Sequence, residues 1–277
     1  MRRILALWAV PRSTSTAFEW MMRMRGDMTC FHEPFGEAWY HGEEPLWPRV
    51  RADSVRTPGL TLGGVWETLR EAVTKGPVFS KDFPHYVAHM WTGERLDMFD
   101  HSFLIRDPAK TISSMYRHWP DFHPGEVGVV EQRELFDRIA DRNGAAPPVL
   151  DSDELLADPA RVVEAYCEAV GIPFVPGALR WEPGARDEVS WWDGGSFHEN
   201  LRNSDGLKPQ ETRHVDIAEA PDRVRVAYET VIAHYEHMRA HRLQVHVVAE
   251  EGKTAASVPS PPSSAVLLLP GRHEFLE

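Results

Sequence analysis

The sequence predicts an α/β fold with a central parallel β-sheet flanked by helices. Four short apolar segments, at 3–10, 77–81, 101–105 and 148–151, are each followed by polar residues and then by a helical pattern. This alternation is typical of parallel sheets whose two faces are both covered. The chain has 277 residues, of which 42% are hydrophobic, so one large domain with a full core is expected.

Apolar residues at helical spacing predict the helices between these strands. Thr16 and Glu19 have the spacing of a capping box after the first strand, and Pro108 is suited to the first position of a later helix. Two long segments, 36–62 and 118–130, are predicted to be irregular, as in loops that bind ligands or cover a site. The predicted helices lie near residues 16–25, 65–75, 108–117, 131–142, 159–170 and 221–241.

The turn after the first strand has the composition of an anion-binding loop. It reads Pro11-Arg12-Ser13-Thr14-Ser15-Thr16 and follows an apolar run. Backbone N–H groups at the start of a helix carry partial positive charge, hydroxyl groups add donors, and a guanidinium adds a permanent charge. We therefore expect these residues to bind a phosphate or sulfate group, with ordinary helix capping as the alternative.

A second motif repeats this arrangement later in the chain. Arg106 ends the apolar run Phe103 to Ile105, Pro108 begins the next predicted helix, and Ser114 lies about two helical turns further on. Ligands of open α/β sheets bind at the carboxyl ends of the strands. Arg106 and Ser114 are therefore predicted to share a ligand with the first loop.

In this order, the two motifs resemble those of sulfotransferases that use 3′-phosphoadenosine 5′-phosphosulfate (PAPS), in particular a bacterial branch. Pro11 to Thr16 resembles their 5′-phosphosulfate loop, and Arg106 with Ser114 resembles their 3′-phosphate motif. The resemblance extends from residue 3 to about residue 242. It implies a three-layer, P-loop NTPase-like fold and metal-independent, in-line transfer of a sulfuryl group from PAPS to a hydroxyl of a small molecule.

The sequence departs from the pattern of this family in three places. Thr14 stands where a glycine is usual, which would limit how closely the backbone approaches the ligand. Ala17 stands where the animal enzymes carry a Trp that stacks on adenine, so another residue such as Phe18 is expected to stack there. Phe83 stands where relatives carry a catalytic His, so another base must take the acceptor proton.

Two residues are candidates for this base. Glu33, the first choice, resembles the carboxylate base of some bacterial sulfotransferases, and burial among aromatic residues is expected to raise its pKa. A structural salt bridge or helix cap is the alternative for Glu33. His85, just past the second strand, is the other candidate. Arg12 is expected to stabilise the leaving phosphate, and Lys81 to assist it.

The late Gly-rich segment 192–207 takes the place of the basic loop of many relatives. Arg202 and Ser204 in this segment are expected to contact the 3′-phosphate, with a solvated turn as the alternative. An apolar or aromatic acceptor is expected from the aromatic residues of the irregular segments and their surroundings, although such residues are more often core. These are Trp39, Tyr40, Trp47, Trp66, Tyr86, Trp91, Trp119 and Phe122.

Charge and composition exclude several other classes. The net charge of −12 argues against a nucleic-acid partner. No apolar run approaches a membrane span, and two cysteines give no disulfide framework, so a cytoplasmic protein is expected. The histidines near 85–89 and 234–241 lack the partners of a zinc site, and no metal is expected. The oligomeric state is left open.

Two other functions are weighed against a sulfotransferase. A P-loop-type nucleotide kinase is disfavoured because the chain has no Gly-x-x-x-x-Gly-Lys-Ser/Thr motif. A non-catalytic nucleotide-binding protein stays in the comparison because the family's usual His is absent. The predicted sulfotransferase domain covers residues 1–245, and 246–277 is predicted to be a flexible tail with a segment at 266–270 that could dock.

Overall fold

The centre of the molecule is a sheet of five parallel strands in the order β2-β3-β1-β4-β5. This computed structural model describes residues 3–47, 56–189, 199–208 and 216–245. The α/β class and the four predicted strands are confirmed, while β2 was not predicted. The strands are β1 (Ile4–Trp8), β2 (Thr29–His32), β3 (Val78–Asp82), β4 (Phe99–Ile105) and β5 (Val149–Asp151).

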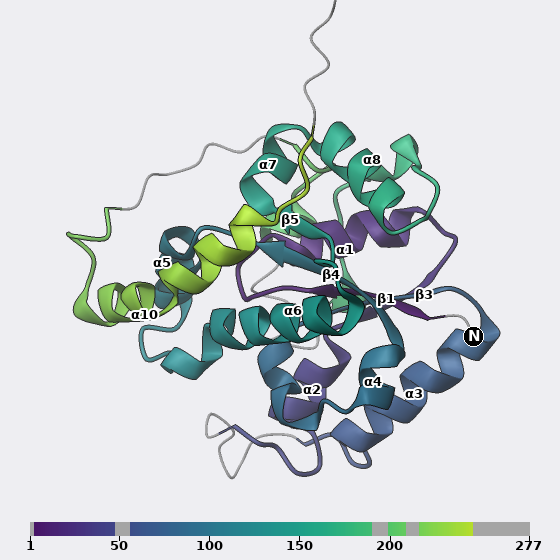
Figure 1. Cartoon of the computed structure of the whole chain (residues 1–277), viewed down its shortest axis with the longest axis horizontal. Coiled ribbons are helices and arrows are strands. Elements are labelled where there is room, and N and C mark those ends of the chain that lie inside the picture. The colour runs from purple at the N-terminus through teal and green to yellow at the C-terminus, as the bar shows by residue number, and fades with distance from the viewer. Residues whose placement is uncertain (1–2, 48–55, 190–198, 209–215, 246–277) are drawn as a thin grey trace, which may run out of the picture. The chain divides into compact units, whose positions relative to one another are not determined.

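Helices cover both faces of this sheet, which gives the three layers expected of a P-loop NTPase-like fold. Figure 1 shows α1 and α8 on one side of the sheet and α6 and α3 on the other. The helices are α1 (Ser15–Met24), α2 (Pro34–His41), α3 (Leu62–Lys75), α4 (Gly93–Asp97), α5 (Pro108–His118), α6 (Val129–Asn143), α7 (Ser152–Ala157), α8 (Pro159–Ala169), α9 (Glu199–Arg202) and α10 (Asp222–Ala240).

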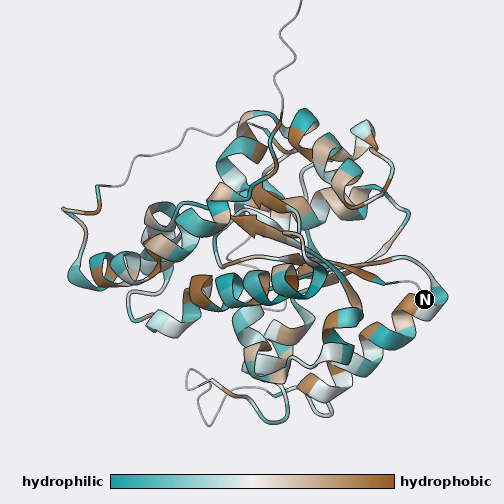
Figure 2. Ribbon diagram, in the orientation of Figure 1, coloured by the Kyte–Doolittle hydropathy of each residue, from teal (hydrophilic) through white to brown (hydrophobic). Residues whose placement is uncertain are grey.

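The core consists of the sheet and the helix faces packed against it. Every residue of β1, β3 and β5 is buried, and the strands are the most continuously apolar part of the ribbon (Figure 2). Such strands form parallel sheets because both of their faces are removed from water. Charged residues also occupy buried positions at strand ends, namely Lys81 and Asp82 of β3 and Asp151 of β5, which indicates a functional site at this edge.

Two local predictions are wrong. The segment 36–62 is not irregular throughout, since it contains most of α2, which Pro34 begins at a position that suits proline. Thr16 and Glu19 do not form a capping box, because α1 begins at Ser15 with Thr14 at its N-cap and no side-chain cap. The short strand β2 escaped prediction because three of its four residues are partly exposed and it lies at a sheet edge.

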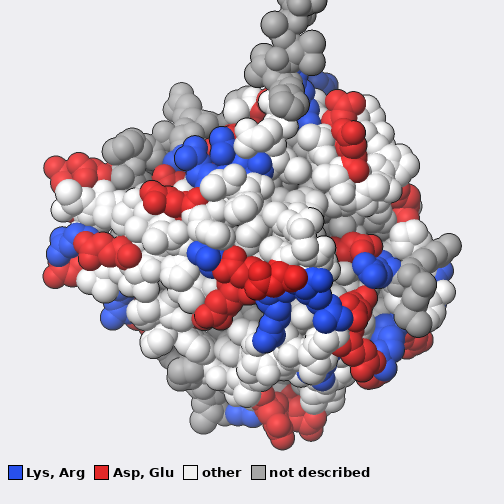
Figure 3. Space-filling model, viewed as in Figure 1, with Lys and Arg blue, Asp and Glu red and all other residues white. Residues whose placement is uncertain are grey.

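The described part of the chain contains no helix that is long and apolar enough to cross a membrane. On the face of the molecule seen in Figure 3, acidic and basic side chains are interspersed. The predictions for the tail 246–277, with its segment 266–270, and for residues 190–198 lie outside the described residues.

Candidate functional site

Four of the predicted site residues meet at the carboxyl edge of the sheet. Arg12 follows β1 and Arg106 follows β4, and these two strands are neighbours in the sheet. Lys81 lies at the end of β3, and Glu33 directly follows β2, the strand that pairs with β3. Residues far apart in the sequence thus share the edge at which ligands of parallel sheets bind.

The loop between β1 and α1 has the backbone shape of an anion-binding nest. Arg12 and Thr14 have φ angles of 68° and 72°, although neither is glycine. Alternation of left-handed and ordinary residues turns successive N–H groups toward one point. The Oγ of Ser13 donates to the carbonyl of Val10 at 2.6 Å, and the Oγ1 of Thr14 accepts from the Oγ of Ser152 at 2.9 Å. Thr14 therefore adopts the conformation that glycine usually provides.

The side chains of the two sequence motifs contact each other directly. The Nε of Arg12 donates to the Oγ of Ser114 at 3.0 Å, and the Nη1 of Arg106 donates to the carbonyl of Arg12 at 2.9 Å. The Nη2 of Arg12 lies 3.4 Å from the Nε2 of His118, which is one helical turn beyond Ser114. Within the described residues the Nε of Arg106 is buried without a hydrogen-bond partner. The two predicted arginines therefore converge on one place.

Two arginines and a histidine gather at this place in an otherwise acidic protein. Burial, followed by the charges of Arg106 and Arg117, lowers the pKa of Arg12 to about 10. Burial, and then Arg12 and Arg117, also lowers the pKa of His118. Like charges held this close repel one another, and a bound anion would relieve the repulsion. The arrangement can therefore hold a phosphate group.

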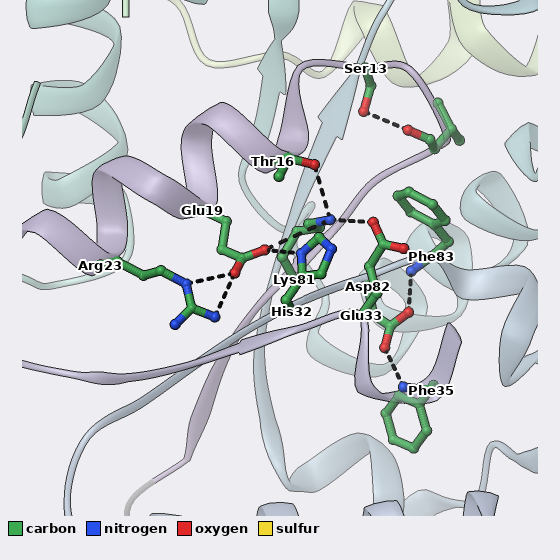
Figure 4. Close-up of polar contacts among 11 residues, drawn as sticks. Ser13, Thr16, Glu19, Arg23, His32, Glu33, Phe35, Lys81, Asp82 and Phe83 are labelled. Carbon is green, nitrogen blue, oxygen red and sulfur yellow. Dashed lines mark hydrogen bonds and ion pairs between the residues drawn. The ribbon is translucent and has the colours of Figure 1, made fainter. Parts of the chain in front are cut away.

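A buried ion pair joins the ends of β2 and β3. The Nζ of Lys81, which is fully buried, donates to the Oε1 of Glu33 and lies 3.5 Å from the Oγ1 of Thr16 in the anion-binding loop (Figure 4). Glu33 stands at the N-cap of α2 with a φ of 43°, and its N–H donates to the carbonyl of Lys81 at 2.8 Å. Both alternatives for Glu33, an ion pair and a position at a helix start, are thus present in the structure.

The expected rise in the pKa of Glu33 is wrong. Burial does favour its neutral form, but the charges of Lys81 and His32, the hydrogen bond from Lys81 and the charge of His85 together hold the pKa below its usual value. Glu33 is therefore a carboxylate at neutral pH. An ionised carboxylate beside a lysine can accept a proton, although its basicity is reduced while the ion pair lasts.

Asp82 behaves in the opposite way. Its carboxyl oxygens accept from the backbone N–H groups of Phe35 at 2.7 Å and Phe83 at 2.9 Å. Burial and the neighbouring charge of Glu33 raise its pKa well above the usual value. The side chain of Asp82 therefore holds the start of α2 through backbone hydrogen bonds.

Sequence reasoning missed a second carboxylate in this cluster. Glu19 of α1 is fully buried, and its Oε1 accepts from the Nε of Arg23 at 2.9 Å. Its Oε2 lies 2.6 Å from the Nδ1 of His32 and 3.8 Å from the Nζ of Lys81. The detectable signal was a charged residue between the apolar Phe18 and Met22, with an Arg four positions later.

His85 is buried in the 3-10 turn Pro84–Tyr86. Its ring stacks on Phe83, with centroids 5.9 Å apart, and both ring nitrogens are without partners among the described residues. Burial lowers its pKa to about 3, while Glu33 acts in the opposite sense. His85 is therefore a neutral imidazole with unused donor and acceptor atoms.

The remaining predicted residues have structural contacts of their own. Ser15 is buried in the first turn of α1. Arg202 ends α9, and the Oγ of Ser204 donates to the carbonyl of Leu201 at 2.7 Å and accepts from Trp181 at 3.0 Å. These contacts hold a turn together, so the hydroxyl of Ser204 is already engaged.

The aromatic predictions divide into core and partly exposed residues. Phe18 is fully buried against Tyr166, so the expectation that it stacks on adenine is wrong. Trp39 stacks on Trp47, with ring centroids 6.0 Å apart, and both are partly exposed. The residues of the predicted set that lie in the core are Tyr40, Trp66, Tyr86 and Phe122, while Trp91 and Trp119 pack against it. No group of three or more metal-ligating side chains occurs in the described ranges.

Comparisons with known proteins place the chain among sulfotransferases. A family model described as "Sulfotransferase domain" matches residues 1–241. Two curated relatives from Arabidopsis thaliana, the branched-chain-amino-acid aminotransferase-like proteins 2 and 1, are each 25% identical, over 75% and 84% of this chain. These matches cover 37% and 42% of the relatives, so the chain spans about two fifths of their length.

Solved structures of sulfotransferases are also similar. STF9 from Mycobacterium avium has a TM-score of 0.48 and 13% identity, with 88% of this chain and 78% of that chain covered. Mouse SULT7A1, solved in complex with PAP, has a TM-score of 0.43 and 12% identity, with 86% and 85% covered.

Proposed function

Because the chain belongs to the sulfotransferase domain family, whose model covers residues 1–241, we propose that it transfers a sulfuryl group from PAPS to a hydroxyl group of a small molecule. The observation that carries the proposal is that two groups of candidate residues lie along the carboxyl edge of one sheet. We call these groups the two halves of the site. Arg12, Arg106 and Ser114 meet at one half. Lys81 and Glu33 form a buried acid–base pair at the other.

The anion-binding loop lies between these halves and is the proposed site of the 5′-phosphosulfate. Its backbone N–H groups, from Ser13 to Thr16, begin a helix whose first turn contains no acidic residue. Arg106 and Ser114 are the proposed ligands of the 3′-phosphate. Arg12 belongs to both regions, because its backbone forms part of the loop while its guanidinium lies on Ser114.

The proposed reaction needs a base and a group that stabilises the leaving phosphate. The acceptor oxygen forms a bond to sulfur as the bond from sulfur to the phosphate oxygen breaks, and the hydroxyl proton passes to Glu33. Lys81, which lies beside Thr16 of the loop, stabilises the charge that develops on the phosphate. As in phosphoryl transfer, positioning and electrostatics supply most of the rate.

Glu33 is favoured over His85 as the base because of its state in the cluster. Glu33 is ionised and bonded to Lys81, the residue proposed to stabilise the leaving phosphate, whereas neither ring nitrogen of His85 has a hydrogen-bond partner among the described residues. The unpartnered ring nitrogens of His85 suit a hydrogen bond to the acceptor hydroxyl. The partly exposed Trp39 and Trp47 favour an apolar or aromatic acceptor. A cytoplasmic location and independence from metals are further parts of the proposal.

Two thermal-shift titrations separate this function from a kinase. 3′-Phosphoadenosine 5′-phosphate (PAP) in EDTA should raise the melting temperature, whereas a nucleotide kinase would respond to ATP with magnesium in a buffer without EDTA. Labelled PAPS should then be incubated with a panel of hydroxylated compounds and the products examined for the mass of one added SO₃ group. Stabilisation by PAP with no transfer to any compound would favour a non-catalytic nucleotide-binding protein.

A further inference from the structure

Lys81 lies between two buried carboxylates, and the proposed reaction uses only one of them. Its ammonium group contacts Glu33 on one side and lies 3.8 Å from the Oε2 of Glu19 on the other (Figure 4). The side chains of Lys81 and Glu19 are fully buried, and that of Glu33 is 10% exposed. A buried charge without a counter-ion is costly in free energy, so we expect each carboxylate to act as a counter-ion of Lys81.

Two carboxylates and several cationic side chains share this cluster. Arg23 and Lys81 supply two positive charges, Glu19 and Glu33 supply two negative ones, and the Nδ1 of His32 lies on Glu19. The pKa of Glu19 lies below its usual value, because His32, Lys81 and Arg23 together outweigh the effect of burial. Burial and the charge of Glu33 raise the pKa of the neighbouring Asp82 well above its usual value.

Transfer of the acceptor proton removes one negative charge from this cluster. When Glu33 takes the proton it becomes neutral, and the ion pair that held Lys81 in place is lost. A buried ammonium without a counter-ion would tend to release its own proton. Lys81 has to stay charged at that moment, because the leaving phosphate is gaining its negative charge.

We propose that Glu19 is a positioning residue that keeps Lys81 charged and directed at the donor while Glu33 takes the acceptor proton. The inference rests on the proposed function. Glu19 suits this role because it is held on both sides. Arg23 binds one of its oxygens at 2.8 Å, and His32 binds the other at 2.6 Å. Its carboxylate therefore stays in position when Lys81 turns away from Glu33.

Other groups around the pair enter the same electrostatic balance. His32, His85, Asp82 and Tyr86 all interact with Glu33. Burial, followed by Tyr40, Glu33 and Asp82, raises the pKa of Tyr86 well above its usual value, so Tyr86 is neutral. Since His85 is neutral as well, the charged partners that carry the argument are Glu19 and Glu33, which pair with Lys81, and Arg23, which pairs with Glu19.

The test compares two substitutions that remove opposite charges from one ion pair. Glu19→Gln removes a negative charge, which should lower the pKa values of both Lys81 and Glu33 by about one unit or more. Arg23→Gln removes a positive charge and should raise both. The pKa of Lys81 is read by NMR from the titration of its ¹³Cε signal in ¹³C-labelled lysine, assigned with Lys81→Met, in the protein with PAP bound.

Turnover gives the second readout. With PAPS and a simple phenol as acceptor, the pH–rate profile should move to lower pH in Glu19→Gln, to higher pH in Arg23→Gln, and back toward the wild-type position in the double variant. A merely structural role predicts lower melting temperatures with unmoved profiles and an unmoved Lys81 titration. That result would overturn the inference.

If Glu19→Gln fails to fold, the variant Arg23→Gln still tests the inference. The side chain of Arg23 is 19% exposed, whereas that of Glu19 is fully buried. An unmoved or lowered Lys81 pKa in Arg23→Gln alone contradicts the inference. If the Lys81 titration moves as expected but wild-type protein transfers no sulfate, the proposed function fails while the electrostatic coupling between Glu19 and Lys81 stands.

Discussion

Arg12 and Ser114, 102 positions apart in the sequence, are joined by a hydrogen bond of 3.0 Å from Nε to Oγ. The contact ties the loop after β1 to α5, so the two motifs form one site. It also places the guanidinium of Arg12 on the residue proposed to bind the 3′-phosphate. The sequence had assigned this side chain to the leaving phosphate at the other end of the nucleotide.

Arg12→Ala is therefore expected to weaken binding of PAP about tenfold or more, because a hydrogen bond to a charged group is lost. The loss should be much smaller for adenosine 5′-phosphate, which lacks the 3′-phosphate. Isothermal titration calorimetry with both nucleotides measures the difference. Ser114→Ala is the matched control and should discriminate between the nucleotides in the same sense. If Arg12→Ala loses the same affinity for both nucleotides, the guanidinium of Arg12 contacts the 5′-phosphate and not the 3′-phosphate.

Glu33→Gln is expected to lower turnover about 10²–10⁴-fold, the usual contribution of a general base. Binding of PAP should survive, because Glu33 belongs to the acceptor half of the site. Labelled sulfate transfer from PAPS to a phenol measures the first effect, and calorimetry with PAP the second. His85→Gln is the companion variant. If it abolishes turnover while Glu33→Gln does not, His85 is the base.

The strands and long helices could be predicted because burial imposes a pattern on their residues. The apolar runs of β1, β3, β4 and β5 stand out from the polar segments that follow them. The short edge strand β2 has no such pattern, because three of its four residues are partly exposed. The helix α2 was hidden by the Gly and Trp residues of its segment, since these are weak helix formers.

The proximity of several candidate residues could be predicted from the sequence, but their electrostatics could not. Resemblance and position at strand ends predicted that Arg12, Lys81 and Glu33 belong to one site, and the structure places them at one edge of the sheet. The pKa of Glu33 depends on Lys81, which is 48 positions away in sequence, and no local pattern contains that contact. Glu19 was given a capping role on spacing alone, and only the packing of α1 against β2 shows that it is buried beside His32.

The stability of the protein should fall in acid because of His85. Its folded pKa of about 3 lies below the ordinary value of 6.5, mainly through burial. The unfolded chain therefore binds a proton that the folded chain does not, so the stabilisation is present above pH 6.5 and is lost as the pH falls toward 3. The free energy of unfolding should lose roughly 1.4 kcal/mol per pH unit from this group within that range.

Urea unfolding of wild type and His85→Leu at about pH 5 and about pH 7 isolates this contribution, since the other titrating groups are common to both proteins. The stability of His85→Leu should depend less steeply on pH. Equal slopes in the two proteins would mean that His85 is protonated in the folded state.

The close approach of Gly128 to His85 gives a prediction about packing. Gly128 caps the start of α6 with a φ of 71°, and a Cβ built on it would overlap the Nδ1 of His85. Gly144 caps the other end of the same helix with a φ of 68°, and a Cβ there would have no atom within 4 Å among the described residues. The two glycines thus share a backbone conformation but differ in what surrounds them.

Gly144→Ala should cost about 1 kcal/mol, the strain of a left-handed alanine, whereas Gly128→Ala should cost clearly more because the imidazole must move. The free energies of unfolding of both variants measure the difference. Adding His85→Ala to Gly128→Ala should recover part of the excess, since the space next to the new methyl group is then free. Because His85 lies beside the acceptor half of the proposed site, Gly128→Ala should also lower turnover while leaving PAP binding unchanged. Equal losses of stability in the two glycine variants would show that a small shift of the α6 backbone makes room for the new methyl group without displacing the imidazole.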